Sequence, residues 1–338
     1  MKENNLSFNI LTGKIINQLI LEHAFEIYEA VKEAYLLHEN GEAINPGSSF
    51  LRFPDKPSSR IIALPASLPT NNVSGIKWIS SNPDNIKHSL PRASAVIILN
   101  DYETGYPFAC MEGAIISATR TACSAVLGAE FLNGQKKSAR CLGVIGCGVI
   151  AKTILKIFSL LEWEFDEVLI FDSSKDNGAD FSKEVEHLFP KITQADSLEE
   201  LIEKSDIIQL ATTALTPYLD NQDLFSHNPI ILNISLRDIS PEVMIESHNI
   251  VDDIDHVLAA DTSPHLTEKH CGHRDFIQGT IAQLVNGTCV VAADRTRIFS
   301  PMGMGILDLA VAMKLFDKAL DAGSLIEIED FHMKNRWM

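Results

Sequence analysis

The spacing of apolar residues changes several times near the N-terminus of the chain. Residues 7–11 predict a short strand. From residue 22 to residue 37, apolar side chains recur every three or four positions, which is the spacing of an amphipathic helix. Residues 41–57 are rich in Gly, Pro and Ser and predict a loop.

Three β-type runs follow this loop, at residues 60–64, 73–80 and 95–100. A turn at residues 101–105 leads from the third run into residues 106–111, and these segments predict a hairpin. Residues 112–132 then predict a long helix, which Asn133 and Gly134 end. We expect this region to form a sheet-and-helix domain of its own.

From residue 140 the chain alternates between strand and helix patterns. A short apolar strand leads into a turn of the form G-x-G-x-x-A, made by Gly146, Gly148 and Ala151. A helix begins near Val149, and a second apolar strand, residues 168–171, ends at an acid. Later strands are predicted at residues 192–195, 207–211, 230–234 and 249–251. This alternation predicts an α/β protein with a Rossmann-type, doubly wound parallel sheet.

The glycine turn has the features of a dinucleotide-binding site. Gly146 permits a tight turn, Gly148 lets the backbone approach a pyrophosphate, and Ala151 lets the helix pack closely on the strand. Asp172 follows the second strand, where a carboxylate accepts hydrogen bonds from both ribose hydroxyls. Because Asp172 would repel a 2′-phosphate, NAD is expected rather than NADP, although Lys175 weakens that preference.

The last amphipathic helix is predicted at residues 306–322, after the nucleotide domain is complete. We therefore expect it to pack back on the N-terminal domain. The predicted organisation is an NAD-binding domain at residues 134–299 and an α+β domain made of residues 1–133 and 300–338.

Composition and charge narrow the class of protein. The 338 residues are 46% hydrophobic and 22% charged, which fits a globular protein of two domains. No apolar run approaches the ~20 residues that span a bilayer, and the N-terminal residues lack the apolar core of a signal peptide. Six scattered cysteines without a C-x-x-C pair fit a reducing cytosol, so a cytoplasmic protein is expected. The net charge of −17 argues against nucleic acid and membranes as partners.

An anionic substrate would need local positive charge to overcome this global field. The cations to consider in the first region are Arg52, Arg60, Lys77, Arg92 and Arg120. Lys77 and Arg120 lie in apolar segments, where a cation either reaches the surface or pairs with a buried group. Three or four such cations would match a substrate with two or three carboxylates.

Asp238 is the acid of most interest, because it follows a strand whose carboxyl end is expected beside a bound cofactor. A carboxylate there would accept and return a proton during chemistry at carbon. The alternative is that Asp238 or Ser240 caps the next helix, and the sequence leaves both readings open. Thr212 and Thr213, after another strand, are expected to line the nicotinamide side.

Metal binding is not expected. The four metal-type residues between 265 and 273 lack the ordered spacing of a zinc site and predict a polar surface segment; they are His265, His270, Cys271 and His273. From the residues alone, Met302 and Met304 are expected to serve packing.

The chain resembles the ornithine cyclodeaminase/μ-crystallin family over nearly its full length. The resemblance is carried by residues 75–78, 101–107, 119–122 and 305–308, together with the glycine turn and Asp238. It implies a homodimer built through the N-terminal domain, to which the C-terminal helix returns. It also implies that this domain binds a small-molecule amino-acid substrate.

The resemblance assigns roles to individual residues. It implies Arg52, Lys77 and Arg120 as ligands of substrate carboxylates, and Asp238 as the catalytic acid and base. It places Met302 near the substrate. The cofactor would be bordered by Val149, Ile150, Asp172, Thr212 and the segment from Ser235 to Asp238. Arg92 stands where ornithine cyclodeaminases have a threonine that contacts the nucleotide, so it would bind either a further carboxylate or a phosphate.

Residues 91–101 and 301–305 resemble a narrower branch of the family, which forms 2,3-diaminopropionate for siderophore or peptide-antibiotic pathways. This implies NAD-dependent oxidative cleavage of N-(2-amino-2-carboxyethyl)-L-glutamate, with Lys77 and Asp238 as the catalytic pair. The alternatives within the family are ornithine cyclodeaminase, alanine dehydrogenase and ketimine reductase. A crystallin-like binder of NAD or NADP without turnover is the alternative from another class.

Overall fold

The computed structural model describes residues 7–332, and these form two compact units. One unit consists of residues 7–120 and 304–332, and the other of residues 121–303. The border between the units passes through helix α3 (Gly113–Leu132). The domain borders expected from the sequence, 133/134 and 299/300, remain a prediction.

The first unit contains a seven-stranded sheet in the order β15-β1-β6-β5-β4-β3-β2. Neighbouring strands are antiparallel except for β1 and β6, which pair in parallel. The strands are β1 (Phe8–Leu11), β2 (Ser49–Phe53), β3 (Lys56–Leu68), β4 (Val73–Ser81), β5 (Ala93–Asp101), β6 (Pro107–Glu112) and β15 (Ile326–Ile328). The helices are α1 (Gly13–Glu22), α2 (Ala24–Glu39), the start of α3, α11 (Gly305–Asp321) and the 3-10 helices η1 (Pro69–Asn71) and η2 (Pro83–His88).

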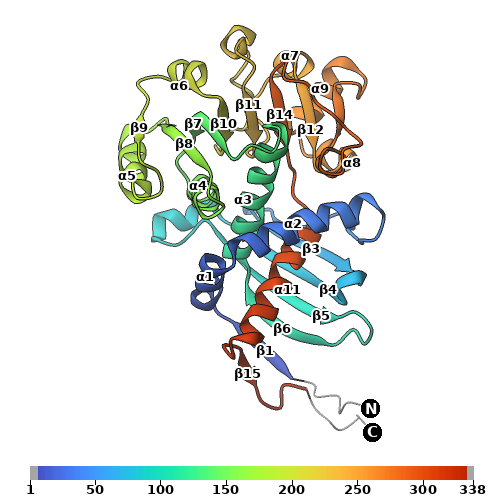
Figure 1. The fold of residues 1–338 in the computed structure, drawn as a ribbon. Coiled ribbons are helices and arrows are strands. Elements are labelled where there is room, and N and C mark those ends of the chain that lie inside the picture. The colour runs from blue at the N-terminus through green and yellow to red at the C-terminus, as the bar shows by residue number, and fades with distance from the viewer. Residues whose placement is uncertain (1–6, 333–338) are drawn as a thin grey trace. The chain divides into compact units, whose positions relative to one another are not determined.

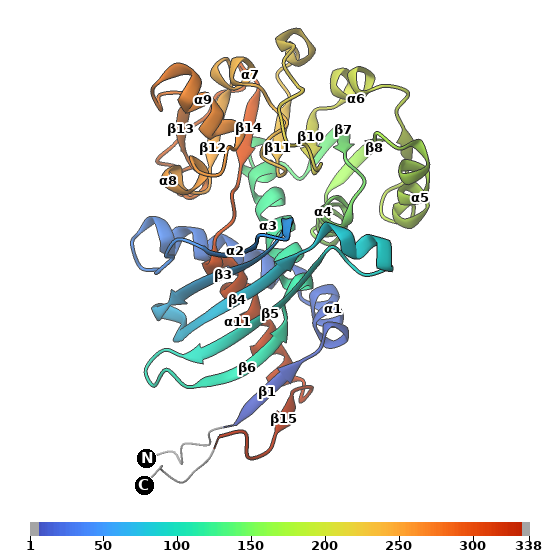
Figure 2. The ribbon, with the colours of Figure 1, turned by 180° about the vertical axis from the view of Figure 1, so that it is seen from behind.

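Period-two burial determines which face of this sheet meets the helices. On β4, Lys77 is buried whereas its neighbour Trp78 is 41% exposed, and on β5 Ile97 is buried whereas Val96 is 40% exposed. Helix α11 packs across β3, β4 and β5 on the buried face (Figure 1). The opposite face is not covered by any helix of the described part of this unit (Figure 2).

The second unit contains eight strands in the order β13-β12-β14-β11-β10-β7-β8-β9, and every neighbouring pair is parallel. The strands are β7 (Ser138–Ile145), β8 (Glu164–Phe171), β9 (Ile192–Gln194), β10 (Ile207–Leu210), β11 (Ile230–Asn233), β12 (His248–Val251), β13 (Ile277–Thr280) and β14 (Arg297–Ser300). The helices are α4 (Val149–Leu160), α5 (Lys175–Val185), α6 (Leu198–Lys204), α7 (Pro241–Ile245), α8 (Ile254–Val257), α9 (Ser263–Cys271), α10 (Ile281–Val285) and the 3-10 helix η3 (Gln222–Phe225). The predicted α/β, Rossmann-type fold is confirmed.

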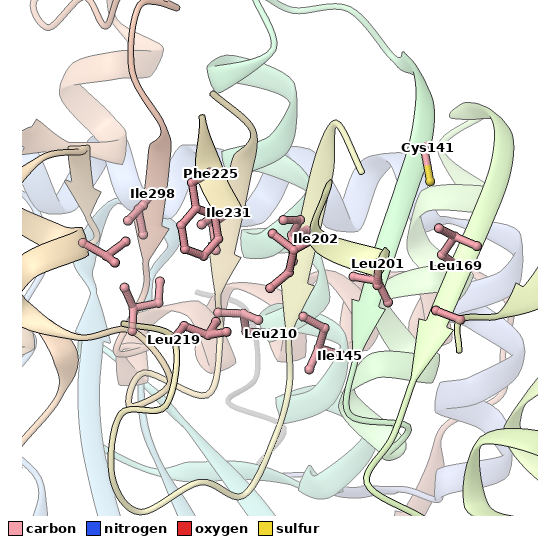
Figure 3. Close-up of a cluster of buried hydrophobic side chains, with 14 of the residues drawn as sticks. Cys141, Ile145, Leu169, Leu201, Ile202, Leu210, Leu219, Phe225, Ile231 and Ile298 are labelled. Carbon is pink, nitrogen blue, oxygen red and sulfur yellow. The ribbon is translucent and has the colours of Figure 1, made fainter. Parts of the chain in front are cut away.

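One face of the parallel sheet is covered by an apolar cluster (Figure 3). Strand residues such as Ile145, Leu210 and Ile231 pack there with Leu201 of α6 and Phe225 of η3. Each of these side chains is almost fully removed from water. Burial of one such side chain contributes on the order of 1.5–3 kcal/mol to the free energy of unfolding. This layer therefore stabilises the sheet whose strands lead into the glycine turn, Asp172 and Asp238.

Most of the predicted elements are confirmed, including the hairpin, the long helix α3, the strands of the parallel sheet and the last helix α11. The predicted loop at residues 41–57 is wrong in part, because β2 and the start of β3 lie within it. All of β2 is at the edge of its sheet and is mostly exposed, so it lacks the alternation that identifies a half-buried strand. The prediction also missed α1 and the short strands β13, β14 and β15.

Helix α3 is the one helix of residues 7–332 that is long and apolar enough, by length and composition, to span a membrane. In this protein, 61% of its most apolar window is buried inside the structure. The helix is therefore a core element, and its Gly128 packs directly against the ring of Phe299.

This contact leads to a stability prediction. A Cβ atom on Gly128 would lie 2.2 Å from Cδ1 of Phe299, so Gly128→Ala should lower the free energy of unfolding by about 1–3 kcal/mol through overpacking. Helix propensity alone would raise it by up to ~1 kcal/mol. Urea unfolding of Gly128→Ala, Phe299→Leu and the double variant gives the coupling free energy between the two positions. Equal costs of Gly128→Ala in both backgrounds would contradict the packing explanation.

Candidate active site

The glycine turn follows β7 and approaches the end of β10 more closely than a side chain would permit. Gly146 has a φ of +88°, and a Cβ atom there would lie 2.6 Å from the carbonyl oxygen of Ala211 and 3.1 Å from Cα of Thr212. Only glycine fits both the backbone conformation and the available space. The turn is thus held directly against the segment that carries Thr212.

Gly148 is the N-cap residue that precedes α4, and it leaves the helix N-terminus open. A Cβ atom there would meet nothing within 4 Å, and Gly148 makes no side-chain cap. Val149, the first helical residue, is 75% exposed, and the first turn carries no acidic residue. Ile150 lies beside it and is half-buried. The first amide groups of α4 are therefore arranged as in an anion-binding helix N-terminus.

Asp172 connects the end of β8 to this turn. Its carboxylate accepts hydrogen bonds from the backbone N–H of Cys147 at 2.9 Å and of Ser174 at 2.9 Å, and from the amide of Asn177 at 3.0 Å. These contacts fix the carboxylate beside the turn. Burial and the charge of Asp172 raise the pKa of the neighbouring Cys147 thiol to about 12, so this cysteine stays protonated and unreactive.

Asp238 is fully buried and surrounded by hydroxyl groups. Thr212 donates to it at 2.5 Å, Ser235 donates to its other oxygen, and the phenol of Tyr218 also hydrogen-bonds to it. A buried carboxylate needs such donors to remain stable. Burial, followed by the charge of Asp238, raises the pKa of Tyr218 above its ordinary value, so the phenol stays a donor.

The backbone around Asp238 is unusually constrained. Leu236 has a φ of +68°, which is rare for a residue with a branched side chain. The adjacent Arg237 donates to the carbonyl oxygens of Ala260 at 2.7 Å and Asp261 at 3.2 Å. These two contacts anchor the loop after β11 to the segment of residues 260–261.

The sequence left open whether Asp238 or Ser240 caps the helix that follows β11. The structure shows which residue is the cap. Ser240 is the N-cap of α7, and its hydroxyl accepts from the backbone N–H of Val243. The side chain of Asp238 instead points to Thr212, Ser235 and Tyr218. Asp238 therefore does not serve as the helix cap.

In the first unit, the structure brings Lys77 and Arg120 together on one buried acid, Asp308. The Nζ of Lys77 lies 2.6 Å from one carboxylate oxygen of Asp308, and the Nε of Arg120 lies 3.4 Å from the other. Lys77 also donates to the hydroxyl of Ser117 at 3.0 Å. Both cations therefore pair with a buried group.

This environment changes the protonation of Lys77. Burial lowers its pKa to about 8, because desolvation disfavours the charged amine. The negative charge of Asp308 opposes this shift, and the positive charge of Arg120 adds to it. Lys77 therefore loses its proton at a lower pH than an exposed lysine does.

The other predicted carboxylate ligands are less enclosed. Arg52, on the edge strand β2, is exposed, and its guanidinium lies 5.1 Å from the ring centroid of Phe50. Arg92 precedes β5 and is also exposed, and its carbonyl accepts from the backbone of Asn82. Within this unit, Arg52 and Arg92 are not part of the buried group around Asp308.

Met302 has a packing role in the second unit. Its side chain packs against the apolar cluster of Val251, Val257, Leu258 and Phe276, as the residues alone suggested. The neighbouring backbone N–H of Gly303 donates to buried Asp252. Its predicted place near a substrate remains untested.

The histidine-rich segment at residues 265–273 carries surface interactions. His265 lies 3.7 Å from Asp261, which also pairs with Lys269, and the thiol of Cys271 donates to the carbonyl of His273. Within residues 7–332, no group of three or more His, Cys, Asp or Glu side chains is arranged to hold a metal ion.

Two residues of these clusters were missed by sequence reasoning. Asp308 lies within a segment that carried the family resemblance, and an acid inside the apolar face of a helix is itself a signal of a buried ion pair. Tyr218 lies in an irregular loop after β10, where no periodic pattern indicates which side chains turn inward.

The glycine turn after β7 and the acid after β8, at one edge of a parallel sheet, are the features of a dinucleotide-binding domain. The chain belongs to the ornithine cyclodeaminase/mu-crystallin family, whose profile matches residues 14–323.

The chain is similar to one sequence relative and two solved structures with stated activities. Over 318 residues, the chain is 32% identical to N-((2S)-2-amino-2-carboxyethyl)-L-glutamate dehydrogenase of Staphylococcus aureus, covering 88% of this chain and 91% of the relative. It is similar to the structure of Thermococcus litoralis Δ1-pyrroline-2-carboxylate reductase with NADH and L-proline, with a TM-score of 0.86, 27% identity and coverage of 95% and 100%. An archaeal alanine dehydrogenase dimer with bound NAD gives a TM-score of 0.83, 25% identity and coverage of 96% and 100%.

The pKa of Lys77 leads to a prediction about stability. Between its folded value of about 8 and its ordinary value of 10.5, the unfolded chain binds more protons at this position than the folded chain. The free energy of unfolding should therefore rise with pH across this window, by up to ~1.4 kcal/mol per pH unit from this group. Lys77→Met should remove that slope in denaturant titrations.

Lys87→Met serves as the control, because it removes an exposed lysine that forms a surface pair with Asp84. The same pH slope in wild type and Lys77→Met would contradict the depressed pKa of Lys77.

Proposed function

We propose that the protein is an NAD-dependent oxidoreductase that acts on the CH–NH bond of an amino-acid conjugate. The proposed substrate is N-((2S)-2-amino-2-carboxyethyl)-L-glutamate, and the products are 2-oxoglutarate and L-2,3-diaminopropionate. This choice of substrate is supported by the 32% identity, over 88% of this chain, to a relative named as the dehydrogenase of this conjugate. The single structural observation that carries the reaction type is the buried Asp238 among hydroxyl donors beside the glycine turn.

The residues around the turn fit NAD. A Cβ atom on Gly146 would fill the space by which the turn approaches Thr212, whereas Gly148 leaves open space in front of α4. The amide groups of α4 suit a pyrophosphate, and Asp172 suits the hydroxyls of an adenosine ribose. Similar structures contain NAD or NADH. A 2′-phosphate would meet the negative charge of Asp172, which favours NAD over NADP.

NAD held by these residues would supply the acceptor for the hydride that leaves the carbon bearing the secondary amine. The residues of this chain transfer protons and position the substrate. Asp238 takes a proton from the water that attacks the resulting C=N bond and returns this proton to the nitrogen. As the C–N bond breaks and the carbonyl forms, Asp238 takes the hydroxyl proton, which is then released to solvent. Thr212, Ser235 and Tyr218 hold its carboxylate so that it need not reorganise between these steps.

We assign substrate carboxylates to the cations of the first unit. Lys77 and Arg120 hold the carboxylate next to the reacting carbon, and Arg52 and Arg92 hold the more distant carboxylates. Arg120 is 13% exposed and suits a partly enclosed carboxylate, whereas the exposed arginines suit the mobile ends of a longer substrate. Fixed orientation of this kind lowers the barrier by several kcal/mol in well-positioned reactions.

We also propose that the protein is a homodimer that buries the uncovered face of the seven-stranded sheet. Leu51, Trp78 and Val96 expose 47%, 41% and 40% of their surfaces on this face. Neighbouring exposed apolar side chains on a sheet are typical of an interface. The solved archaeal alanine dehydrogenase is described as a dimer.

Turnover of the conjugate tests the proposed reaction. Wild type should produce NADH and 2-oxoglutarate from N-((2S)-2-amino-2-carboxyethyl)-L-glutamate and NAD. Asp238→Asn should lower kcat by at least ~100-fold, because it removes the base, while NADH affinity measured by fluorescence stays within about twofold. NADH formation from L-alanine, proline formation from ornithine, or ligand-induced stabilisation without turnover would each favour an alternative member of the family.

Trp78→Glu tests the proposed interface. A charge in the centre of the apolar face should shift the protein from dimer to monomer in sedimentation velocity, because an unpaired charge is costly to bury. Leu215→Glu, at a residue that is 83% exposed in the second unit, is the control and should leave the mass unchanged. A monomeric wild type, or a dimeric Trp78→Glu, would contradict this proposal.

A further inference from the structure

Asp308 is the most completely buried charge in the cation cluster of the first unit. It lies near the start of α11, where its side chain is 0% exposed, and it contacts Lys77 of β4 and Arg120 of α3. A lone carboxylate in such a position would be costly, so its two partners are required for its burial. Three separate elements thus meet through one acid.

The charges of this cluster do not cancel. Two cations share one carboxylate, which leaves one net positive charge on Lys77, Arg120 and Asp308 when Lys77 is protonated. Arg120 contacts Asp308 through Nε, so the terminal Nη1 and Nη2 groups form the edge suited to a second carboxylate. The cluster therefore has the charge and donor geometry for one further carboxylate.

The neighbours of Lys77 define what controls its protonation. The charged groups that act on it are Asp308 from α11 and Arg120 from α3, and Ser117 of α3 accepts a hydrogen bond from it. The residues paired with Lys77 on the adjacent strands, Leu64 and Ile97, are apolar. Asp308 is thus the neighbouring anion that favours the protonated amine.

We propose that Asp308 is a positioning residue that holds Lys77 charged and Arg120 oriented, so that the pair accepts a single substrate carboxylate. This rests on the proposed function, which assigns a carboxylate of an amino-acid substrate to Lys77 and Arg120. Asp308 itself does not touch the substrate in this assignment. It acts by fixing the two groups that do.

The test uses carboxylate binding to the enzyme loaded with NADH, with 2-oxoglutarate, pyruvate and L-proline as probes in calorimetric titrations. In Asp308→Asn, the dissociation constant of the bound probe should rise ~10-fold or more at pH 8, because Lys77 loses its charge and Arg120 its fixed contact. The loss should grow as the pH is raised from about 6.5 to 8.5, since the pKa of Lys77 falls below about 8 without the opposing charge.

Asp308→Glu distinguishes the effect of the carboxylate's position from the effect of its charge. It also provides a second variant to measure if Asp308→Asn does not fold. Glutamate retains the negative charge but displaces it by one methylene, so affinity should fall while the pH at which binding is lost stays as in wild type. Asp321→Asn, at an exposed residue of the same helix, is the matched control and should bind like wild type.

Unchanged or tighter binding in Asp308→Asn across the whole pH range would overturn the proposal, since Asp308 would then act only as a competitor for the cations. Lower thermal stability with unchanged affinity would also overturn it, because the role would be structural. Absence of turnover with the glutamate conjugate would refute the proposed substrate, yet the binding titrations would still decide the role of Asp308.

Discussion

The common direction of the strands in the second unit is the constraint on which the candidate site depends. Because β7, β8, β10 and β11 are all parallel, the residues that follow them emerge at one edge of the sheet. The glycine turn, Asp172, Thr212 and Ser235 come from four different segments but stand after adjacent strands. The close approach of Gly146 to Ala211 also fixes the position of the glycine turn relative to the segment that carries Thr212.

The two units stabilise a buried acid in different ways. Asp238 is surrounded by neutral hydroxyl donors, which stabilise a buried carboxylate without giving it a fixed cationic partner. Asp308 instead has two cations, one of which is almost fully buried. Under the proposed function, the neutral donors let Asp238 gain and lose a proton, and the excess positive charge around Asp308 suits the binding of a further carboxylate.

Much of the candidate site could be predicted from the sequence because its signals are local. The turn at Gly146 and Gly148, the acid after the second strand and the alternation of strands and helices each occupy a short stretch of chain, and the family resemblance is confirmed. The edge strand β2 was missed because both of its faces are largely exposed, so no alternation marks it. Short strands such as β14 carry too few residues for a period to be recognised.

By itself, the sequence determined the α/β class, the dinucleotide-type turn and the residue types available for catalysis, since these follow from local spacing and backbone preference. Only the tertiary structure decided which groups become partners. Lys77 and Asp308 are separated by 231 positions, and their ion pair exists because α11 returns to pack across β4. Likewise, Ser240 rather than Asp238 caps α7, because the loop anchored by Arg237 turns Asp238 toward the hydroxyls of other segments.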